Sequence, residues 1–110
     1  MKDGLTIDNG GTKRWYLNDK YHRTDGPAIE YYNGDKQWFL NGKHHRTDGP
    51  AIEYSNGEKK WYINGRLHRT DGPAIEYTSG NKYWYLNGKS LSQEDYIKTN
   101  RNNKLELLIL

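Results

Sequence analysis

The sequence repeats every 23 residues, and this period constrains the fold more than any other feature. The octet Arg-Thr-Asp-Gly-Pro-Ala-Ile-Glu occurs three times, and its copies begin at Arg23, Arg46 and Arg69. The four tryptophans follow the same step, at Trp15, Trp38, Trp61 and Trp84. Near the amino end, residues 2–8 echo residues 24–30 at a step of 22, which predicts a partial copy with one deletion. The pattern stops after Lys89. Such a period indicates an array in which each unit packs on its neighbours.

The composition suits an array better than a globule. Only 33% of the 110 residues are hydrophobic, and ten Tyr and four Trp supply much of the apolar surface. The mean hydropathy of −1.20 excludes a large buried core. Aromatic side chains of this kind are half-buried on a sheet while their polar atoms stay in water. We therefore expect one domain, with a repeat array over residues 1–89 and a carboxy-terminal cap over residues 90–110.

Several protein classes are excluded by what the sequence lacks. It has no cysteine, which rules out disulfides and thiolate metal sites and fits a reducing cytosol. Residues 1–11 lack the apolar core of a signal peptide, and the longest apolar run, residues 107–110, is too short to span a membrane. The formal net charge of +3 is spread over all copies, which is too weak to indicate nucleic acid by itself. We expect a cytoplasmic protein.

Each copy reads as a β-hairpin unit. In residues 43–65, Asn56-Gly57 and Asn64-Gly65 are signals for two-residue type I′ turns, because both turn positions need positive φ. Residues 58–63 between them form a short aromatic strand. Residues 43–55 form one longer strand, bent at Asp48-Gly49-Pro50, where proline removes a ladder donor. Two strands per copy keep all copies equivalent, and their right-handed twist is expected to curl the sheet.

The turns predict which residues share a face. With Asn33-Gly34 as a two-residue loop, Ile29 lies opposite Trp38, and with Asn41-Gly42 as the next loop, His45 lies opposite Trp38. One face would then carry Trp, Ile, Leu, Tyr and His and form the core. The other face would be partly solvated and would carry Ala28, Glu30, Tyr32, Gln37, Phe39, His44 and Arg46. Equivalent residues of adjacent copies would lie roughly 10 Å apart.

A family resemblance rests on these same residues. The order Asn-Gly-Lys, His, Gly, an aliphatic residue, Glu-Tyr, Asn-Gly, and then Lys, Trp and Tyr is similar to MORN repeats, most closely to their short bacterial and phage variant. It covers about residues 3–89, although Arg-Thr-Asp-Gly-Pro stands where MORN repeats have a tighter Gly-x-Gly. The resemblance implies an all-β fold, a single-layer twisted antiparallel sheet of tandem hairpins. Bacterial members of the variant are known as YwqK-type antitoxins, and the His-Arg-x-Asp-Gly-Pro-Ala signature resembles repeats of uncharacterised phage proteins.

The carboxy-terminal segment reads as a cap. Ser92-Gln93-Glu94-Asp95 matches a capping box and predicts a short helix over residues 93–101, which Asn102 and Asn103 would end. The apolar tail, residues 105–110, must then be buried. Two interpretations stay open: the helix and tail cover the last hairpin, or the tail is a surface for self-association or a partner. The open sheet edge is a second candidate for self-association.

The repeat argues against an active site. Spacing of about 10 Å between His22, His45 and His68 excludes a shared zinc, and we expect these side chains to pack against tryptophan. Asp25, Asp48 and Asp71 are expected to fix the bend through hydrogen bonds from side chain to backbone. We assign no catalytic, cofactor-binding or metal-binding residue and expect no enzyme.

Two further rows of the array allow a competing interpretation. Arg23, Arg46 and Arg69 form a basic row, and residues 16, 39, 62 and 85 form an aromatic one. Together such rows could bind a nucleotide or single-stranded nucleic acid. Alternatively, each arginine pairs with an Asp or Glu that repeats at the same period.

We therefore predict a non-enzymatic protein-binding module. The resemblance implies an inhibitor or antitoxin-like protein of a bacterium or phage. The alternatives are a nucleotide or nucleic-acid binder and a self-assembling scaffold. Specificity should come from positions that differ between copies: Tyr21, His44 and Leu67; Tyr32, Ser55 and Thr78; and Arg14, Gln37, Lys60 and Tyr83. The candidate partner-binding residues are Tyr16, Tyr32, Gln37, Phe39, His44, Arg46, Lys60, Tyr62, Leu67, Arg69, Tyr83 and Tyr85.

Overall fold

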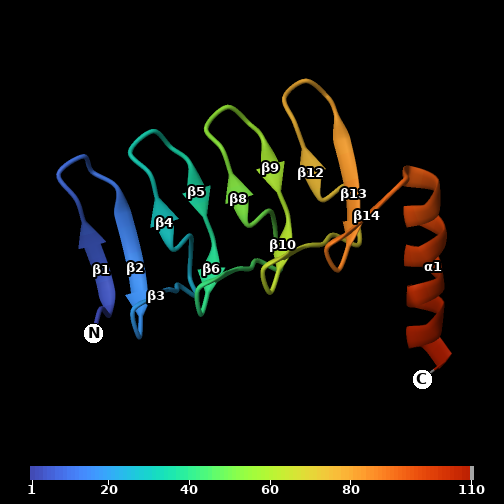
Figure 1. The fold of residues 1–110 in the computed structure, drawn as a ribbon, viewed down its shortest axis with the longest axis horizontal. Helices are drawn as coiled ribbons and strands as arrows, with labels where there is room; N and C mark the ends of the chain where they lie inside the picture. Colours follow the sequence, from blue (N-terminus) through green and yellow to red (C-terminus); the bar gives the residue numbers. More distant parts are fainter. Residues whose placement is uncertain (110) are drawn as a thin grey trace.

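The computed structural model describes residues 1–109, and the side chains of residues 1–108. It shows an open antiparallel sheet of hairpins followed by one helix at the carboxy-terminal end (Figure 1). The strands are β1 (Gly4–Ile7), β2 (Lys13–Leu17), β3 (Lys20–Tyr21), β4 (Ile29–Glu30), β5 (Lys36–Gln37), β6 (Phe39–Leu40), β7 (Lys43–His44), β8 (Ile52–Glu53), β9 (Lys59–Lys60), β10 (Tyr62–Ile63), β11 (Arg66–Leu67), β12 (Ile75–Glu76), β13 (Lys82–Leu86) and β14 (Lys89–Leu91). The helix is α1 (Gln93–Ile109). The extents of the molecule are 48 × 37 × 18 Å.

The long return segment of each copy, predicted as one bent strand, is two short strands: β7 lies in a two-stranded sheet with β6, and β8 lies in the main sheet. β7 pairs with β6 and β8 pairs with β5, and β5 and β6 are consecutive parts of one strand. Residues 46–50 leave the ladder between these two pairings. The main sheet has the order β1-β2-β4-β5-β8-β9-β12-β13-β14, with β3 paired to β2. Backbone hydrogen bonds from Arg23 N to Phe39 O and from Gly42 N to Tyr21 O join β6 to the copy before it.

The two kinds of Asn-Gly turn differ. Asn41 and Gly42 both have positive φ, 51° and 79°, so this turn and its equivalents form the predicted two-residue connection. In the loop at Asn33 and Gly34, only Gly34 has positive φ, 98°. The Asn33 side-chain oxygen there accepts a hydrogen bond from Asp35 N at 3.0 Å, and Gly34 N donates to Tyr31 O at 2.9 Å. The prediction of a type I′ turn is wrong here, because the loop is a three-residue type I turn closed by a left-handed glycine.

This extra loop residue shifts the register. Ile29 lies opposite Gln37 and not opposite Trp38, so the predicted pairing is wrong by one residue. Because side chains alternate, a one-residue slip moves them to the other face. Ile29 therefore shares a face with Phe39, and together with Ala28 these two form a buried cluster against which Tyr21 and Tyr31 pack. The His45 backbone bonds Trp38 O at 3.1 Å, which fits the other predicted pairing.

We name the two faces by their aromatic rows. The tyrosine face carries Ile29, Gln37, Phe39 and His44 with their equivalents in the other copies. The tryptophan face carries the Trp38 row, together with the rows that include Ala28, Glu30, Lys36, Leu40 and Lys43. The predicted faces are wrong in grouping Ile and Tyr31 with Trp, and in grouping Glu30 and Arg46 with Phe39. Ala28 lies opposite Trp38 in register but packs in the same buried cluster as Phe39.

β1 also differs from its prediction. Thr6 pairs with Arg14 as Ile29 pairs with Gln37, so residues 4–7 follow the step of 23 and no deletion is present. Leu5 and Ile7 consequently stand where the next copy has Ala28 and Glu30, on the tryptophan face.

The helix begins as predicted but ends later. Ser92 Oγ accepts a hydrogen bond from Asp95 N at 3.1 Å, as a capping residue does. Asn102 and Asn103 lie inside α1, so the predicted end near Arg101 is wrong; asparagine only mildly disfavours a helix, and the leucines after it favour one. Of the two interpretations of the apolar tail, burial against the last hairpin is wrong for Leu107 and Leu108, which are 72% and 80% exposed, and a surface for self-association or a partner stays a prediction. Leu110, the last tail residue, lies outside the described residues. Within the described residues no helix is long and apolar enough to cross a membrane.

Candidate protein-binding face

A row of rings in contact, each tilted by 31–45° against the next, runs across the tyrosine face from Tyr16 to Tyr62. The ring centroids are 5.2 Å apart from Tyr16 to Tyr21, 5.2 Å from Tyr21 to Phe39, 4.1 Å from Phe39 to His44 and 5.0 Å from His44 to Tyr62. The type I′ turns bring them together, because each turn sets the aromatic residue of one strand directly opposite the variable residue of the next. Leu67 stands opposite Tyr62 in the same way. Neighbouring aromatic pairs of this kind each contribute about 0.5–1.5 kcal/mol.

The row is uncharged at neutral pH. Burial lowers the pKa of His44 below its ordinary value, so the imidazole stays neutral. Its Nε2 lies 2.9 Å from the Gln37 side-chain oxygen. Burial likewise raises the pKa of Tyr62, so its phenol stays protonated. The surface therefore offers neutral rings with hydroxyl and amide groups at their edges.

A second row of differing residues lies on the same face, closer to the three-residue loops. It consists of Arg14, Gln37, Lys60 and Tyr83, each directly opposite an isoleucine or its equivalent Thr6. Lys60 Nζ lies 5.6 Å from the Tyr54 ring centroid, and the Tyr83 ring meets the Tyr77 ring edge-on at 5.8 Å. The tyrosine face thus combines two of the three rows that differ between copies.

The arginine row lies on the opposite face and is internally paired. The Arg46 guanidinium stacks on the Trp38 ring at 3.8 Å, and its Nη1 donates to Pro50 O at 3.1 Å. Its Nε donates to Asp48 at 2.9 Å, and Glu53 lies 3.3 Å from Nη1. Arg23 and Arg69 repeat all four contacts. Of the two interpretations of this row, the structure shows pairing with carboxylates.

The bend depends on this arginine. A Cβ on Gly49 would lie 2.8 Å from Arg46 Cζ, so a larger residue there would displace the guanidinium from its place beneath the bend. The Arg46 guanidinium bonds the Asp48 carboxylate and lowers the pKa of that carboxylate, and a weaker hydrogen bond to the Asp48 backbone contributes in the same direction. The aspartates were predicted to bond the backbone, and their stronger bond is to the arginine. Clefts of about 690 Å³ and 400 Å³ separate consecutive bends, and both are lined by these paired ions.

The histidines of the tryptophan face connect adjacent copies. His45 Nδ1 accepts a hydrogen bond from Asn64 N at 3.0 Å, and His22 and His68 accept equivalent bonds from Asn41 N and Asn87 N, both at 2.9 Å. Each bond holds the turn of the next copy. No group of three metal-ligating side chains occurs in the described part of the chain.

A test of stability against pH follows from these histidines. Burial lowers the pKa of His68 from its ordinary 6.5, and protonation would also remove the Nδ1 lone pair that Asn87 N uses. A lowered folded-state pKa gives a stabilisation that is complete above the unfolded-state value and is lost as pH falls through the folded-state value. We expect the urea midpoint to fall between about pH 7.5 and pH 5.5, above the range where carboxylates titrate. His68→Gln should reduce this slope, and an unchanged slope would contradict the assignment.

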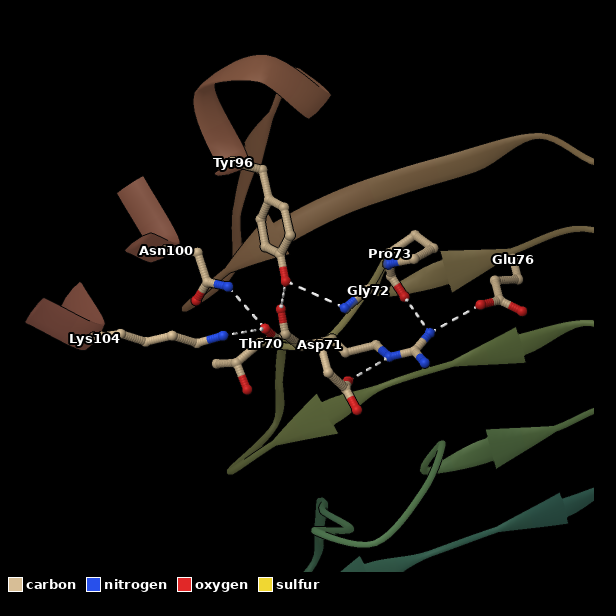
Figure 2. Close-up of polar contacts among 9 residues, drawn as sticks. Thr70, Asp71, Gly72, Pro73, Glu76, Tyr96, Asn100 and Lys104 are labelled. Atoms are coloured by element: carbon tan, nitrogen blue, oxygen red, sulfur yellow. Dashed lines mark hydrogen bonds and ion pairs between the residues drawn. The ribbon is translucent and has the colours of Figure 1, made fainter. Parts of the chain in front are cut away.

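At the last copy, Tyr96, Asn100 and Lys104 of α1 contact the bend at residues 70–72, as Figure 2 shows. The position 23 residues after Arg69 is Ser92, where α1 is capped. Tyr96 Oη donates to Arg69 O at 2.6 Å, and Gly72 N donates to Tyr96 Oη at 3.4 Å. Asn100 Nδ2 donates to Thr70 O at 2.7 Å. We did not single out Tyr96 or Asn100 from the sequence alone. The signal that could have revealed them is their spacing of four residues, which Lys104 continues and which places all three on one side of the helix.

The structure brings together most of the predicted partner-binding residues. The aromatic row and the residues beside it on the tyrosine face include Tyr16, Gln37, Phe39, His44, Lys60, Tyr62, Leu67, Tyr83 and Tyr85. Arg46 and Arg69 are separated from them on the tryptophan face. Tyr32 projects from a three-residue loop and is 79% exposed.

Comparisons with known proteins found no match to this chain among protein-family models, curated proteins or solved structures.

Proposed function

We propose that this protein is a non-enzymatic binding module whose tyrosine face holds a protein partner. The main support for this proposal is that two rows of residues that differ between copies lie on this face, beside the row of aromatic rings. The rows of the tryptophan face, such as Trp38, Arg46, Glu53 and Lys59, are nearly invariant from copy to copy. Invariant rows build the array, and differing rows distinguish one segment of the surface from the next.

The chemistry of the tyrosine face supports a protein partner. Tyrosine, phenylalanine and methionine are enriched in protein interfaces, and charged residues are depleted at their centres. Here the row of aromatic rings is neutral, and of the second row only Arg14 and Lys60 are charged. Tyrosine is also among the residues that most often dominate binding energy.

The repeat supports a role without catalysis. An active site needs unlike groups that converge on one reacting atom, whereas each copy offers the same groups at a regular interval along the sheet. The resemblance to the short MORN variant extends the proposal to an inhibitor or antitoxin-like protein of a bacterium or its phage, acting in the cytoplasm by direct binding.

The nucleic-acid alternative receives less support. It requires cationic groups interleaved with free ring faces. The arginine row and the tyrosine row lie on opposite faces, and every arginine of the repeated octet is engaged by carboxylates, a carbonyl and a tryptophan ring.

Lys59 and Lys60 allow a matched test, because they are adjacent and have the same side chain but lie on opposite faces. A photo-crosslinking amino acid such as p-benzoylphenylalanine would replace each in turn, in cells that make the protein. We expect residue 60 to yield a crosslinked protein of one defined mass and residue 59 to yield little of it. Equal crosslinking from both positions, or none from residue 60, would contradict the proposal.

A further inference from the structure

The two ends of the sheet differ in how they are protected. α1 lies beside β13 and β14 at the carboxy-terminal end, whereas β1 at the amino-terminal end pairs only with β2 among the described residues (Figure 1). Edge strands normally carry lysine, proline or a bulge that prevents pairing with another chain. The four residues of β1 are Gly, Leu, Thr and Ile, and Leu5 and Ile7 are 48% and 59% exposed. This edge is open and apolar.

The register shows which backbone groups β1 offers. Asp8 N bonds Thr12 O at 3.1 Å, and hydrogen-bonded pairs alternate along an antiparallel ladder, so Gly4, Thr6 and Asp8 bond toward β2. Trp15 N, in contrast, bonds Ala28 O on the far side of β2. The N–H and C=O groups of Leu5 and Ile7 therefore point away from the sheet.

We propose that a second copy of this chain docks on β1, antiparallel, with Thr6 on the two-fold axis. In that register Leu5 of one copy exchanges hydrogen bonds with Ile7 of the other, so all four outward N–H groups of the two strands find acceptors. The same pairing sets Leu5 against Ile7 of the second copy twice on the tryptophan face. The strand complements itself in both hydrogen bonding and side chains.

Neighbouring registers fit less well. With Leu5 on the axis, Ile7 would face Asp3 of the second copy; with Ile7 on the axis, Leu5 would face Asn9. Both of these registers lose the two contacts between Leu5 of one copy and Ile7 of the other. The two-fold axis is perpendicular to the sheet, so both tyrosine faces lie on the same side of the dimer and remain open. Dimerisation through β1 and binding of a protein partner on the tyrosine face are therefore independent of each other.

Single cysteines test the register directly, because the chain has no native cysteine. Thr6 would face its own copy in a non-hydrogen-bonded pair with Cα atoms about 4.5 Å apart, within the range of a disulfide. Under mild oxidation we expect Thr6→Cys to form a covalent dimer at least about tenfold faster than Leu5→Cys or Ile7→Cys. Equal rates, or a faster reaction at either flanking position, would overturn the proposal.

The unmodified protein provides the second measurement. An interface of this size is weak, so we expect a reversible dimer by sedimentation at about 100 μM. Ile7→Glu should abolish it without unfolding the chain, because Glu occupies the equivalent position 30 and would here face Lys13. Leu107→Glu, on the exposed side of α1, is the matched control and should leave the dimer intact. A monomer at that concentration, or a dimer lost only in the control, would refute pairing through β1.

Discussion

Replacing Arg46 with alanine is expected to lower the free energy of unfolding by about 3 kcal/mol, from lost charge-assisted hydrogen bonds and the cation–π contact. The bond to the Pro50 carbonyl and the stack on Trp38 carry most of this loss, because both are partly shielded from water. Asp48 contributes little, since its side chain is 83% exposed. Without the guanidinium, the bend at residues 46–50 loses the group around which it folds.

Urea denaturation measures this effect, with Arg66→Ala as the control. Arg66 is exposed and forms no ion pair in the described part of the chain, so its removal should cost less than about 0.5 kcal/mol. Arg46→Lys should recover only part of the loss, because an ammonium cannot bond several acceptors while lying flat on a ring. A loss below about 1 kcal/mol for Arg46→Ala would show that the bend does not depend on its arginine.

Replacing Tyr96 with alanine is expected to cost about 3–4 kcal/mol and to release α1 from the sheet. Among the described side chains of α1, residues 93–108, Tyr96 is the most buried, and its hydroxyl bonds both ends of the third bend. Burial raises the pKa of Tyr96, so the hydroxyl keeps the proton that it donates to Arg69 O. Released from the sheet, a helix of this length is only marginally stable in water.

Far-UV circular dichroism should therefore show loss of the helical signal together with the loss of stability. Tyr96→Phe removes only the hydroxyl and should cost about 1 kcal/mol while the helix remains. The adjacent Ile97 is exposed, and Ile97→Ala should change stability by less than about 0.5 kcal/mol. A full helical signal in Tyr96→Ala would mean that α1 is held by other contacts.

The turns show how far the sequence could be interpreted. Asn41-Gly42 and Asn33-Gly34 are the same dipeptide between similar strands, but only the first has positive φ at both residues. The second is decided by the Asn33 side chain, which bonds the backbone of Asp35. The type of turn therefore depends on the residues that flank Asn-Gly and not on the dipeptide alone. One residue of difference then moved Ile29 from the predicted face to the other.

The helix illustrates the difference between local and distant signals. Its start could be predicted because Ser92 bonds backbone groups within the first turn. Its end could not, because Lys104, beyond the predicted end, donates a hydrogen bond to Thr70 O in a bend that lies far away in the sequence. Asn102 and Asn103 predict a helix end, but asparagine disfavours a helix only mildly. Their free-energy cost is smaller than the stabilisation from this contact and from the leucines that follow.

The candidate site was predictable in part for the same reason. Tyr16, Phe39 and Tyr62 align because equal spacing places them at equal positions along a regular ladder. Arg46 could not be placed by alternation, since the bend takes it out of the strand and over Trp38. The register, once known, separates the rows that differ between copies from the rows that build the array.

The most direct test of this separation extends the crosslinking experiment to three neighbouring pairs. Gln37, Lys60 and Tyr83 lie on the tyrosine face, and Lys36, Lys59 and Lys82 precede them on the tryptophan face. We expect the same crosslinked partner from residues 37, 60 and 83, with little product from residues 36, 59 and 82. Product distributed without regard to face, or concentrated at the lysines of the tryptophan face, would contradict this separation.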